Sequence, residues 1–153
     1  MKLSSKGRYG LRALIDLAMY SEEETVSISS IAARQHISDA YLEQLMAKLK
    51  KAGLVVSIRG AQGGYKLAKP AQEISVGDIL RALEGNLEAV QCQGLSEEGC
   101  SGSELCVSKY VWQRINESIS NTVDHIMLDT LVEESRAAHK KHQDVQLDEG
   151  VCK

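Results

Sequence analysis

The sequence predicts a mainly α-helical fold with a small β-hairpin wing, namely a winged helix-turn-helix followed by a long C-terminal dimerisation helix. Apolar residues recur at helical spacing along most of the 153 residues, and one short glycine-interrupted stretch has strand character. The chain has one Pro and no Phe, which favours helices over a β-sandwich with many turns. Its length fits one compact domain with an extension and is too short for a two-domain enzyme of ordinary size.

The first two helices are predicted from their capping residues. Ser4 and Ser5 are candidate N-caps for a helix that ends at the acidic run 22–24. A second, shorter helix is expected to begin near Ser27 or Ser29. Both sequences have an apolar stripe with i, i+3 and i+4 spacing, so each is predicted to pack one face on a core.

A third helix is predicted after a short turn at 35–37. Ser38 is its N-cap, and Gly53 ends it. Its apolar face is formed by Leu42, Leu45, Met46 and Leu49. Two short helices joined by such a turn are typical of a helix-turn-helix, in which the second helix enters the major groove of DNA.

A β-hairpin directly after this pair makes the prediction more specific. Residues 54–58 and 65–68 are the two strands, and 59–64 is a turn with three glycines. Ser75 then caps a fourth helix that stops at Gly85. Residues 1–85 are therefore interpreted as a winged helix-turn-helix DNA-binding domain. The glycines do not fit a nucleotide-binding loop, because no helix opens after them.

The remaining chain is divided into three parts. Residues 86–107 lose helical periodicity and form a cysteine-rich loop, 108–132 form the dimerisation helix, and 133–153 form a polar, disordered tail. The apolar stripe of the long helix exceeds what a small domain can cover, which favours a second subunit as its partner; the alternative is that it packs on its own domain. The predicted interface residues are Val111, Ile115, Ile119 and Val123.

Charge is distributed unevenly along the chain. The overall net charge of −3 argues against nucleic acid as a partner. However, residues 1–70 contain eleven Lys and Arg against six Asp and Glu, whereas residues 71–153 contain seven against fifteen. The first half therefore has the charge of a DNA-binding domain. No membrane span or signal peptide is predicted, so a cytoplasmic location is expected.

The winged-helix interpretation assigns DNA-binding roles to polar residues outside the core stripes. Glu43 and Gln44 have the chemistry to read base edges, and Arg59 at the tip of the wing suits insertion into a narrow minor groove. The other expected DNA-contacting residues are Ser38, Tyr41, Lys48, Lys6 and Arg8. The alternative for each is an ordinary solvated surface residue.

Three cysteines lie within fifteen residues, with the spacing C-x7-C-x5-C. These are Cys92, Cys100 and Cys106, and Cys92 and Cys100 do not occupy periodic core positions. In a cytoplasmic protein such cysteines favour a metal centre over structural disulfides. The absence of a C-x2-C pair makes zinc the weaker alternative, and free thiols or a redox-active disulfide stay open.

Three segments closely resemble the Rrf2 family of bacterial winged-helix regulators: 1–10, 38–45 and 57–65. The resemblance extends over about residues 1–130. It implies a homodimer on a palindromic operator in double-stranded DNA, with the long helices at the interface. It also implies that Glu43 reads bases and that Arg59 enters the minor groove. Ala40 departs from the hydroxyl residue of the family's iron–sulfur regulators, which points to a different half-site preference.

The resemblance further implies that the three cysteines bind a 2Fe–2S cluster. Family members that regulate cysteine metabolism lack these cysteines. The position of the histidine ligand in the iron–sulfur regulators is Lys109 here, and an acidic ligand from the start of the partner is replaced by Arg8 and Arg12. The candidates for the fourth ligand are Lys109, Cys152, Glu104, His125 or an exogenous group.

These observations together predict a transcriptional regulator whose operator binding is modulated by an iron–sulfur cluster. Two alternatives within the same family stay open: a nitric-oxide-sensing repressor, and a cluster-free regulator that responds to thiols or cysteine metabolism. An enzyme is not expected, because no catalytic triad, phosphate loop or carboxylate pair is recognisable.

Overall fold

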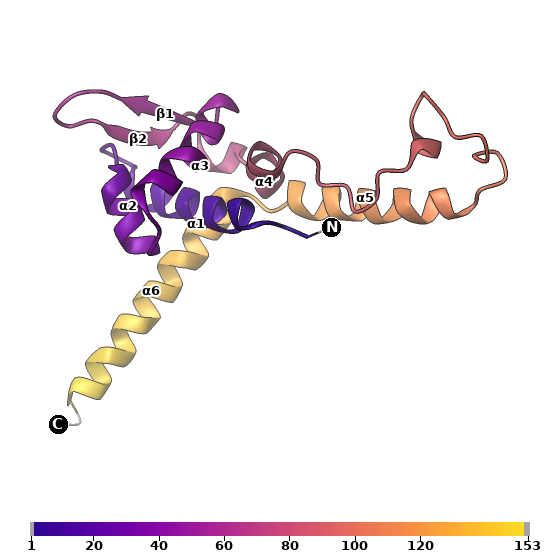
Figure 1. Ribbon diagram of the computed structural model, residues 1–153. Helices are drawn as coiled ribbons and strands as arrows, with labels where there is room; N and C mark the ends of the chain where they lie inside the picture. The colour runs from indigo at the N-terminus through magenta and orange to yellow at the C-terminus, as the bar shows by residue number, and fades with distance from the viewer. Residues whose placement is uncertain (1, 152–153) are drawn as a thin grey trace.

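The computed structural model describes residues 2–151, with side chains described through residue 146 (Figure 1). In this part of the chain six α-helices and one two-stranded antiparallel sheet follow one another, with short 3₁₀ turns at Ala71–Glu73 and Gln93–Leu95. The elements are α1 (Ser5–Tyr20), α2 (Ile28–Gln35), α3 (Asp39–Lys51), β1 (Val55–Ile58), β2 (Gly64–Leu67), α4 (Val76–Glu84), α5 (Ser108–Asp124) and α6 (Leu128–Val151). The mainly helical fold with a small hairpin wing is confirmed.

The predicted capping residues define the helix starts. The side chains of Ser4, Ser27 and Ser38 accept hydrogen bonds from the first turns of α1, α2 and α3. At α4, Ser75 and Asp78 form a reciprocal capping box at 3.0 Å in both directions. Local sequence is therefore sufficient to set these boundaries, because each cap satisfies amides within its own turn.

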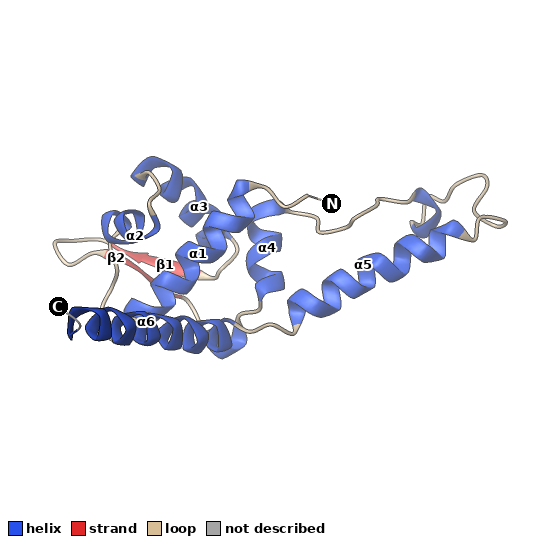
Figure 2. Ribbon diagram, turned by 90° about the horizontal axis from the view of Figure 1, so that it is seen from below, coloured by secondary structure: helices blue, strands red, loops and turns tan. Residues whose placement is uncertain are grey.

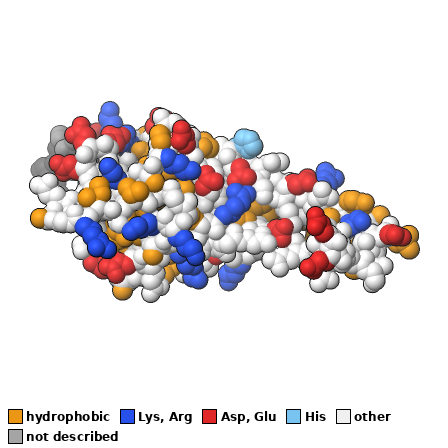
Figure 3. Space-filling view, turned by 90° about the horizontal axis from the view of Figure 1, so that it is seen from above, with side chains coloured by type: hydrophobic (Ala, Val, Ile, Leu, Met, Phe, Trp, Pro, Cys, Tyr) orange, Lys and Arg blue, Asp and Glu red, His pale blue; other side chains and the backbone are white. Residues whose placement is uncertain are grey.

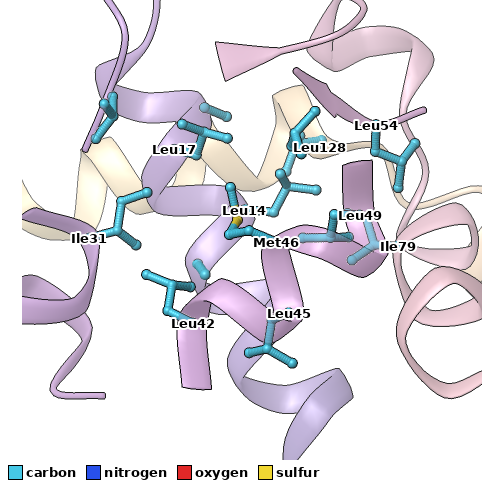
Figure 4. Close-up of a cluster of buried hydrophobic side chains, with 14 of the residues drawn as sticks. Leu14, Leu17, Ile31, Leu42, Leu45, Met46, Leu49, Leu54, Ile79 and Leu128 are labelled. Atoms are coloured by element: carbon cyan, nitrogen blue, oxygen red, sulfur yellow. The ribbon is translucent and has the colours of Figure 1, made fainter. Parts of the chain in front are cut away.

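The core lies where α1, α2, α3 and α4 meet the wing and the start of α6. Its largest fully buried side chains include the complete predicted stripe of α3 (Figure 4). They are Leu14, Leu17, Ile31, Leu42, Leu45, Met46, Leu49, Val55, Ile74, Ile79 and Leu128. This continuous cluster fixes the orientation of α3, so its other face is presented to solvent.

The wing is a short hairpin attached to the helical body. Val55 pairs with Leu67 and Ile58 with Gly64, in antiparallel register. A bridge between Val26 and Tyr65 joins the second strand to the segment before α2. The turn contains Gly60 at φ +118°, a conformation that L side chains rarely adopt.

The prediction of one continuous helix over 108–132 is wrong. The helix breaks at 125–127, where the Val76 amide donates to the Ile126 carbonyl and the Leu128 amide donates to the Ile74 carbonyl, each at 2.8 Å. Leu128 then enters the core with no exposed surface. These backbone bonds to the start of α4 replace helical ones, so α5 and α6 diverge from this point (Figure 1).

The prediction of a disordered tail over 133–153 is also wrong for the part that the structure describes. Helix α6 continues to Val151. The stretch after Leu128 has many good helix formers and no Gly or Pro before Gly150, which favours helix despite its polarity. A guanidinium nitrogen of Arg136 forms an ion pair with the Glu22 carboxylate at 2.6 Å, which attaches α6 to the segment just after α1.

Helix α5 and the cysteine loop form an arm that extends from the winged-helix domain (Figure 2). No residue of α5 is buried, whereas α1 and α3 each have several buried residues. The base of the arm packs on α4, where Arg81 forms a bidentate ion pair with Asp124. None of the helices within residues 2–151 is both long and apolar enough to cross a membrane.

Candidate nucleic-acid interface and metal-binding loop

The solvent face of α3 presents the predicted base-reading residues. Glu43, Gln44 and Lys48 are all exposed, while Leu42 and Leu45 point into the core. The two sets alternate because the helix has 3.6 residues per turn. The structure thus leaves both a carboxylate and an amide free on the surface of the second helix of the helix-turn-helix.

Ser38 and Tyr41 have structural contacts at the start of the same helix. The Ser38 hydroxyl accepts from the Tyr41 amide at 3.2 Å, and the Tyr41 hydroxyl donates to the Ser5 hydroxyl at 3.1 Å. The Tyr41 ring packs edge-on against Tyr9, with centroids 6.1 Å apart. Ser38 therefore caps α3 and Tyr41 positions it against α1, in addition to the DNA contacts predicted for both residues.

Arg59 lies exposed in the turn between β1 and β2, as expected for the tip of a wing. Besides the backbone bridge to Val26, two side-chain hydrogen bonds attach the wing to the helical body. The Lys50 ammonium donates to the Ser57 hydroxyl at 2.7 Å, and the Thr25 hydroxyl donates to the Gln62 carbonyl at 2.7 Å. The wing and α3 are thereby fixed relative to each other.

Cations from three helices gather beside α3. Lys6, Lys48, Lys51 and Arg81 line a hollow of about 390 Å³, and Arg8 is also exposed. Figure 3 shows Lys and Arg side chains spread over the winged-helix half, whereas acidic side chains predominate on the narrow arm. Sequence reasoning did not include Arg81 in this set, since only the fold brings α4 next to α1 and α3.

The three cysteines all lie in the loop between α4 and α5, but they do not converge. Cys100 is exposed, and Cys92 and Cys106 are half-buried free thiols. No group of three or more His, Cys, Asp or Glu side chains is arranged for a metal ion within the described residues. The donor set nevertheless fits an iron–sulfur cluster chemically, since three thiols in the one loop between α4 and α5 match its usual ligands.

Two of the thiols lie close to the first turn of α5. Cys106 Sγ is 3.1 Å from the Ser108 hydroxyl. This hydrogen bond, and a further one from the Lys109 amide, lower the pKa of the Cys106 thiol. A side chain added at Gly94 would lie 3.5 Å from Cys92 Sγ and 3.6 Å from the Lys109 stem, so Cys92 also lies near this turn.

Two residues of α5 attach the loop to the helix. The Lys109 ammonium donates to the Ser103 carbonyl at 2.7 Å. Asn116 is bound on both sides, accepting from the Ala89 amide at 2.8 Å and donating to the Val90 carbonyl at 3.0 Å. Sequence reasoning missed Asn116, because nothing in its local sequence indicates a partner 26 residues earlier.

The candidates for a fourth ligand differ in their distance from the thiols. Lys109 lies beside the thiols with its ammonium bound to a carbonyl, and Glu104 lies in the same loop. His125 lies at the opposite end of α5, about 25 Å along the helix, so within one chain it is excluded. Cys152 lies outside the described residues.

The predicted dimer stripe of α5 divides into two parts. Ile119 and Val123 pack on Val76, Leu80 and Leu87 of their own chain. Val111 and Ile115 are 51% and 39% exposed. The alternative in which the helix packs on its own domain therefore applies to the second half of α5, and an unpartnered apolar surface is left on the first half. Tyr110, Val107 and Leu105, next to it in sequence, are also exposed.

Comparison with known proteins agrees with this geometry. Residues 3–134 match the profile of the Rrf2 family, described as an iron-dependent transcriptional regulator. The chain is 45% identical to the HTH-type transcriptional regulator IscR of Serratia proteamaculans over 132 residues, covering 86% of this chain and 79% of the relative. The corresponding regulator of Aliivibrio salmonicida is 40% identical and covers 99% and 90%.

Two solved structures resemble the fold closely. The IscR structure of T. potens has a TM-score of 0.71 and 44% identity, covering 90% of each chain. CymR, the global cysteine regulator of B. subtilis, has a TM-score of 0.73 and 39% identity, covering 88% of this chain and 98% of its own. One relative is thus of the IscR type and the other is a cysteine regulator.

Proposed function

Since the chain belongs to the Rrf2 family of transcriptional regulators, we propose that it binds an operator in double-stranded DNA as a homodimer and that an iron–sulfur cluster on its cysteine loop modulates this binding. The observation that carries the proposal is the combination of a solvent-facing α3 with three free thiols in one loop attached to α5. It acts as a regulator and not as an enzyme, in the cytoplasm where its operator is.

DNA recognition is assigned to α3 and the wing. Glu43 accepts a hydrogen bond from cytosine N4, and Gln44 pairs with adenine, each in the major groove. Arg59 enters the adjacent minor groove, where a narrow groove concentrates negative potential. Lys6, Arg8 and Lys48 contact phosphates and supply affinity that depends steeply on salt.

The first half of α5 is assigned to the partner subunit. Val111 and Ile115 are exposed because the domain packs only against the second half of α5. Burying them against a second copy of the chain would remove this apolar surface from water. A two-fold dimer places two copies of α3 in successive major grooves, which requires a palindromic operator.

Cys92, Cys100 and Cys106 are the proposed cluster ligands. A bound 2Fe–2S cluster would supply a redox- and oxygen-sensitive group that responds to iron or nitric oxide. The chain's own contribution is to bring the loop into one ordered arrangement. Lys109 and Asn116 attach the loop to α5 near its two ends, and Cys92, Cys100 and Cys106 would hold the cluster.

Anaerobic purification with absorption spectra and with iron and sulfide analysis tests the proposal. We expect a coloured wild-type protein and loss of the cluster in Cys92→Ala, Cys100→Ala and Cys106→Ala. Ser101→Ala, in the same loop, is the matched control and should retain iron. An iron-free, colourless wild type that still binds a duplex selected from a random pool contradicts the cluster and supports a thiol-responsive regulator.

DNA-binding measurements on the same preparations decide between the alternatives. Comparing the dissociation constant for the selected duplex with and without the cluster shows whether the cluster modulates binding. Loss of binding on addition of nitric oxide, at unchanged affinity in air, favours the nitric-oxide-sensing alternative. A wild-type protein that selects no duplex contradicts DNA binding itself.

A further inference from the structure

The N-terminus of α1 is capped by a carboxylate from another helix. Glu84, the last residue of α4, accepts hydrogen bonds at Oε1 from the Ser4 amide at 2.9 Å, the Ser4 hydroxyl at 2.6 Å and the Gly7 amide at 2.9 Å. These contacts connect residues 77 to 80 positions apart in the sequence. They lower the pKa of Glu84, chiefly through the Ser4 hydroxyl.

The first turn of α1 needs such a charge because of its own sequence. It contains no acidic residue, and Lys6 and Arg8 place positive charge at the end of the helix where the dipole is already positive. A carboxylate at this end offsets that repulsion. Cations can then be concentrated next to α3 without destabilising the helix start.

Two glycines make the close approach of the helices possible. A Cβ at Gly7 would lie 2.7 Å from Glu84 Oε1, and a Cβ at Gly10 would overlap the Leu83 side chain. Both glycines are buried within α1. Since neither requires a positive φ, the absence of a side chain serves the packing of α1 on α4 and not the backbone conformation.

The capped turn also contacts α3. Ser5 lies between Ser4 and Lys6, and its hydroxyl accepts from Tyr41 in the first turn of α3. On the other side, Glu84 is followed by Gly85 at φ +81°, where the chain leaves for the cysteine loop. Cys92 is only eight residues further along the chain.

We infer that Glu84 is a positioning residue for DNA binding: its carboxylate fixes residues 4–7, and with them Lys6 and the start of α3, in the arrangement that contacts DNA. The inference rests on the proposed DNA-binding function. Glu84 also lies only eight residues before Cys92, so this contact is at the end of the domain from which the cysteine loop leaves.

The substitution Glu84→Gln separates this role from a simple charge effect. Removing a negative charge near DNA by itself tightens binding, whereas loss of positioning weakens it, so the two mechanisms predict opposite signs. We expect about tenfold weaker binding to a duplex selected by the wild type, measured by fluorescence anisotropy. We also expect a smaller slope of affinity against salt, by about one phosphate contact.

Glu73→Gln is the matched control. It removes the same charge from an exposed residue just before α4, without a hydrogen bond to α1. Its affinity should equal or slightly exceed that of the wild type. Ser4→Asp in the Glu84→Gln background returns a carboxylate to the same helix end and should restore binding to within about threefold of the wild type.

The thermal unfolding midpoint shows whether each variant is folded in the assay. If Glu84→Gln unfolds, Glu84→Asp takes its place, because the shorter side chain keeps the charge but loses its reach to Gly7. A folded Glu84→Gln variant that binds as tightly as Glu73→Gln overturns the inference. A wild type that selects no duplex instead overturns the proposed function.

Discussion

The winged-helix domain and the arm made of α5 and the cysteine loop differ in how much of their apolar surface they bury. In the domain, α3 alone buries Leu42, Leu45, Met46 and Leu49. In the arm, α5 buries no residue, and Val111 remains half exposed. Helix α5 has the same amphipathic spacing as the domain helices, but within the described residues only its second half packs on another apolar surface of the chain.

This difference indicates where the molecule depends on other groups. The domain has a closed core, so the residues proposed to contact DNA are positioned by its own packing. The arm is attached to the domain at the base of α5, through the Arg81–Asp124 pair and the packing of Ile119 and Val123, while Asn116 and Lys109 hold its loop on α5. It is therefore the part whose structure a second subunit and a metal centre can complete, which suits a sensing element.

The largest expected effect comes from paired truncations in the two regions. Leu45→Ala removes a side chain that is 1% exposed and should lower the free energy of unfolding by about 2–5 kcal/mol. Ile115→Ala, at 39% exposure, should change the unfolding of the winged-helix domain little and weaken self-association instead. Denaturant unfolding and sedimentation equilibrium measure the two quantities.

The comparison of the two regions fails if Ile115→Ala destabilises the domain as strongly as Leu45→Ala. Equal self-association of the wild type and Ile115→Ala across the concentration range would show that Ile115 lies outside the dimer interface.

The sequence predicts the domain better than the arm for the same physical reason. The caps at Ser38 and Ser75 and the stripe around Leu45 depend on neighbours within one or two helical turns. The break at 125–127 instead depends on backbone bonds to residues 74 and 76, on the other side of the cysteine loop. No local pattern indicates it, and the apolar Ile126 continues the helical stripe.

The same distinction separates the site residues. Exposure of Glu43, Gln44 and Arg59 follows from the helix and hairpin patterns that predict the fold. Arg81 and Glu84 gain their roles only when α4 packs on α1, and Asn116 only when the loop folds back on α5. Polar contacts over long sequence separations leave no periodic signal, so they were not predicted.

An intermediate effect is expected at the junction of the two regions. Gly77 is buried in α4, and a Cβ there would overlap Asp124 Oδ1 and lie 2.7 Å from an Arg81 nitrogen. Gly77→Ala should displace this ion pair, but it gains up to about 1 kcal/mol of helix propensity. We therefore expect the free energy of global unfolding to change by about 1 kcal/mol or less. Hydrogen exchange at the Val76 and Leu128 amides should become faster.

Gly102→Ala is the matched control, because no atom lies within 4 Å of a Cβ at that position. It should leave exchange at Val76 and Leu128 unchanged. Unaltered exchange in Gly77→Ala would mean that the arm is attached to α4 by its apolar contacts alone, and not by the Arg81–Asp124 pair.

The smallest expected effect is the pH dependence of that ion pair, whose side chains are both 41% exposed. The hydrogen bond from Arg81 lowers the pKa of Asp124, with smaller contributions from the charges of Arg81 and His125. Asp78 is a further charge near Arg81. A carboxylate with a lowered folded-state pKa contributes stability above its unfolded pKa of about 3.9 and loses it as pH falls through the folded value.

Wild type should therefore be more stable than Asp124→Asn at neutral pH, and the difference should shrink as pH falls below about 4 and vanish below the folded pKa of Asp124. Asp144→Asn, an exposed position with no ion pair in the described part of the chain, should show no such difference at any pH. Denaturant unfolding at several pH values measures both. A difference for Asp124→Asn that persists undiminished at the lowest pH means that the asparagine acts through packing against Gly77, so the charge of Asp124 does not attach the arm to the domain.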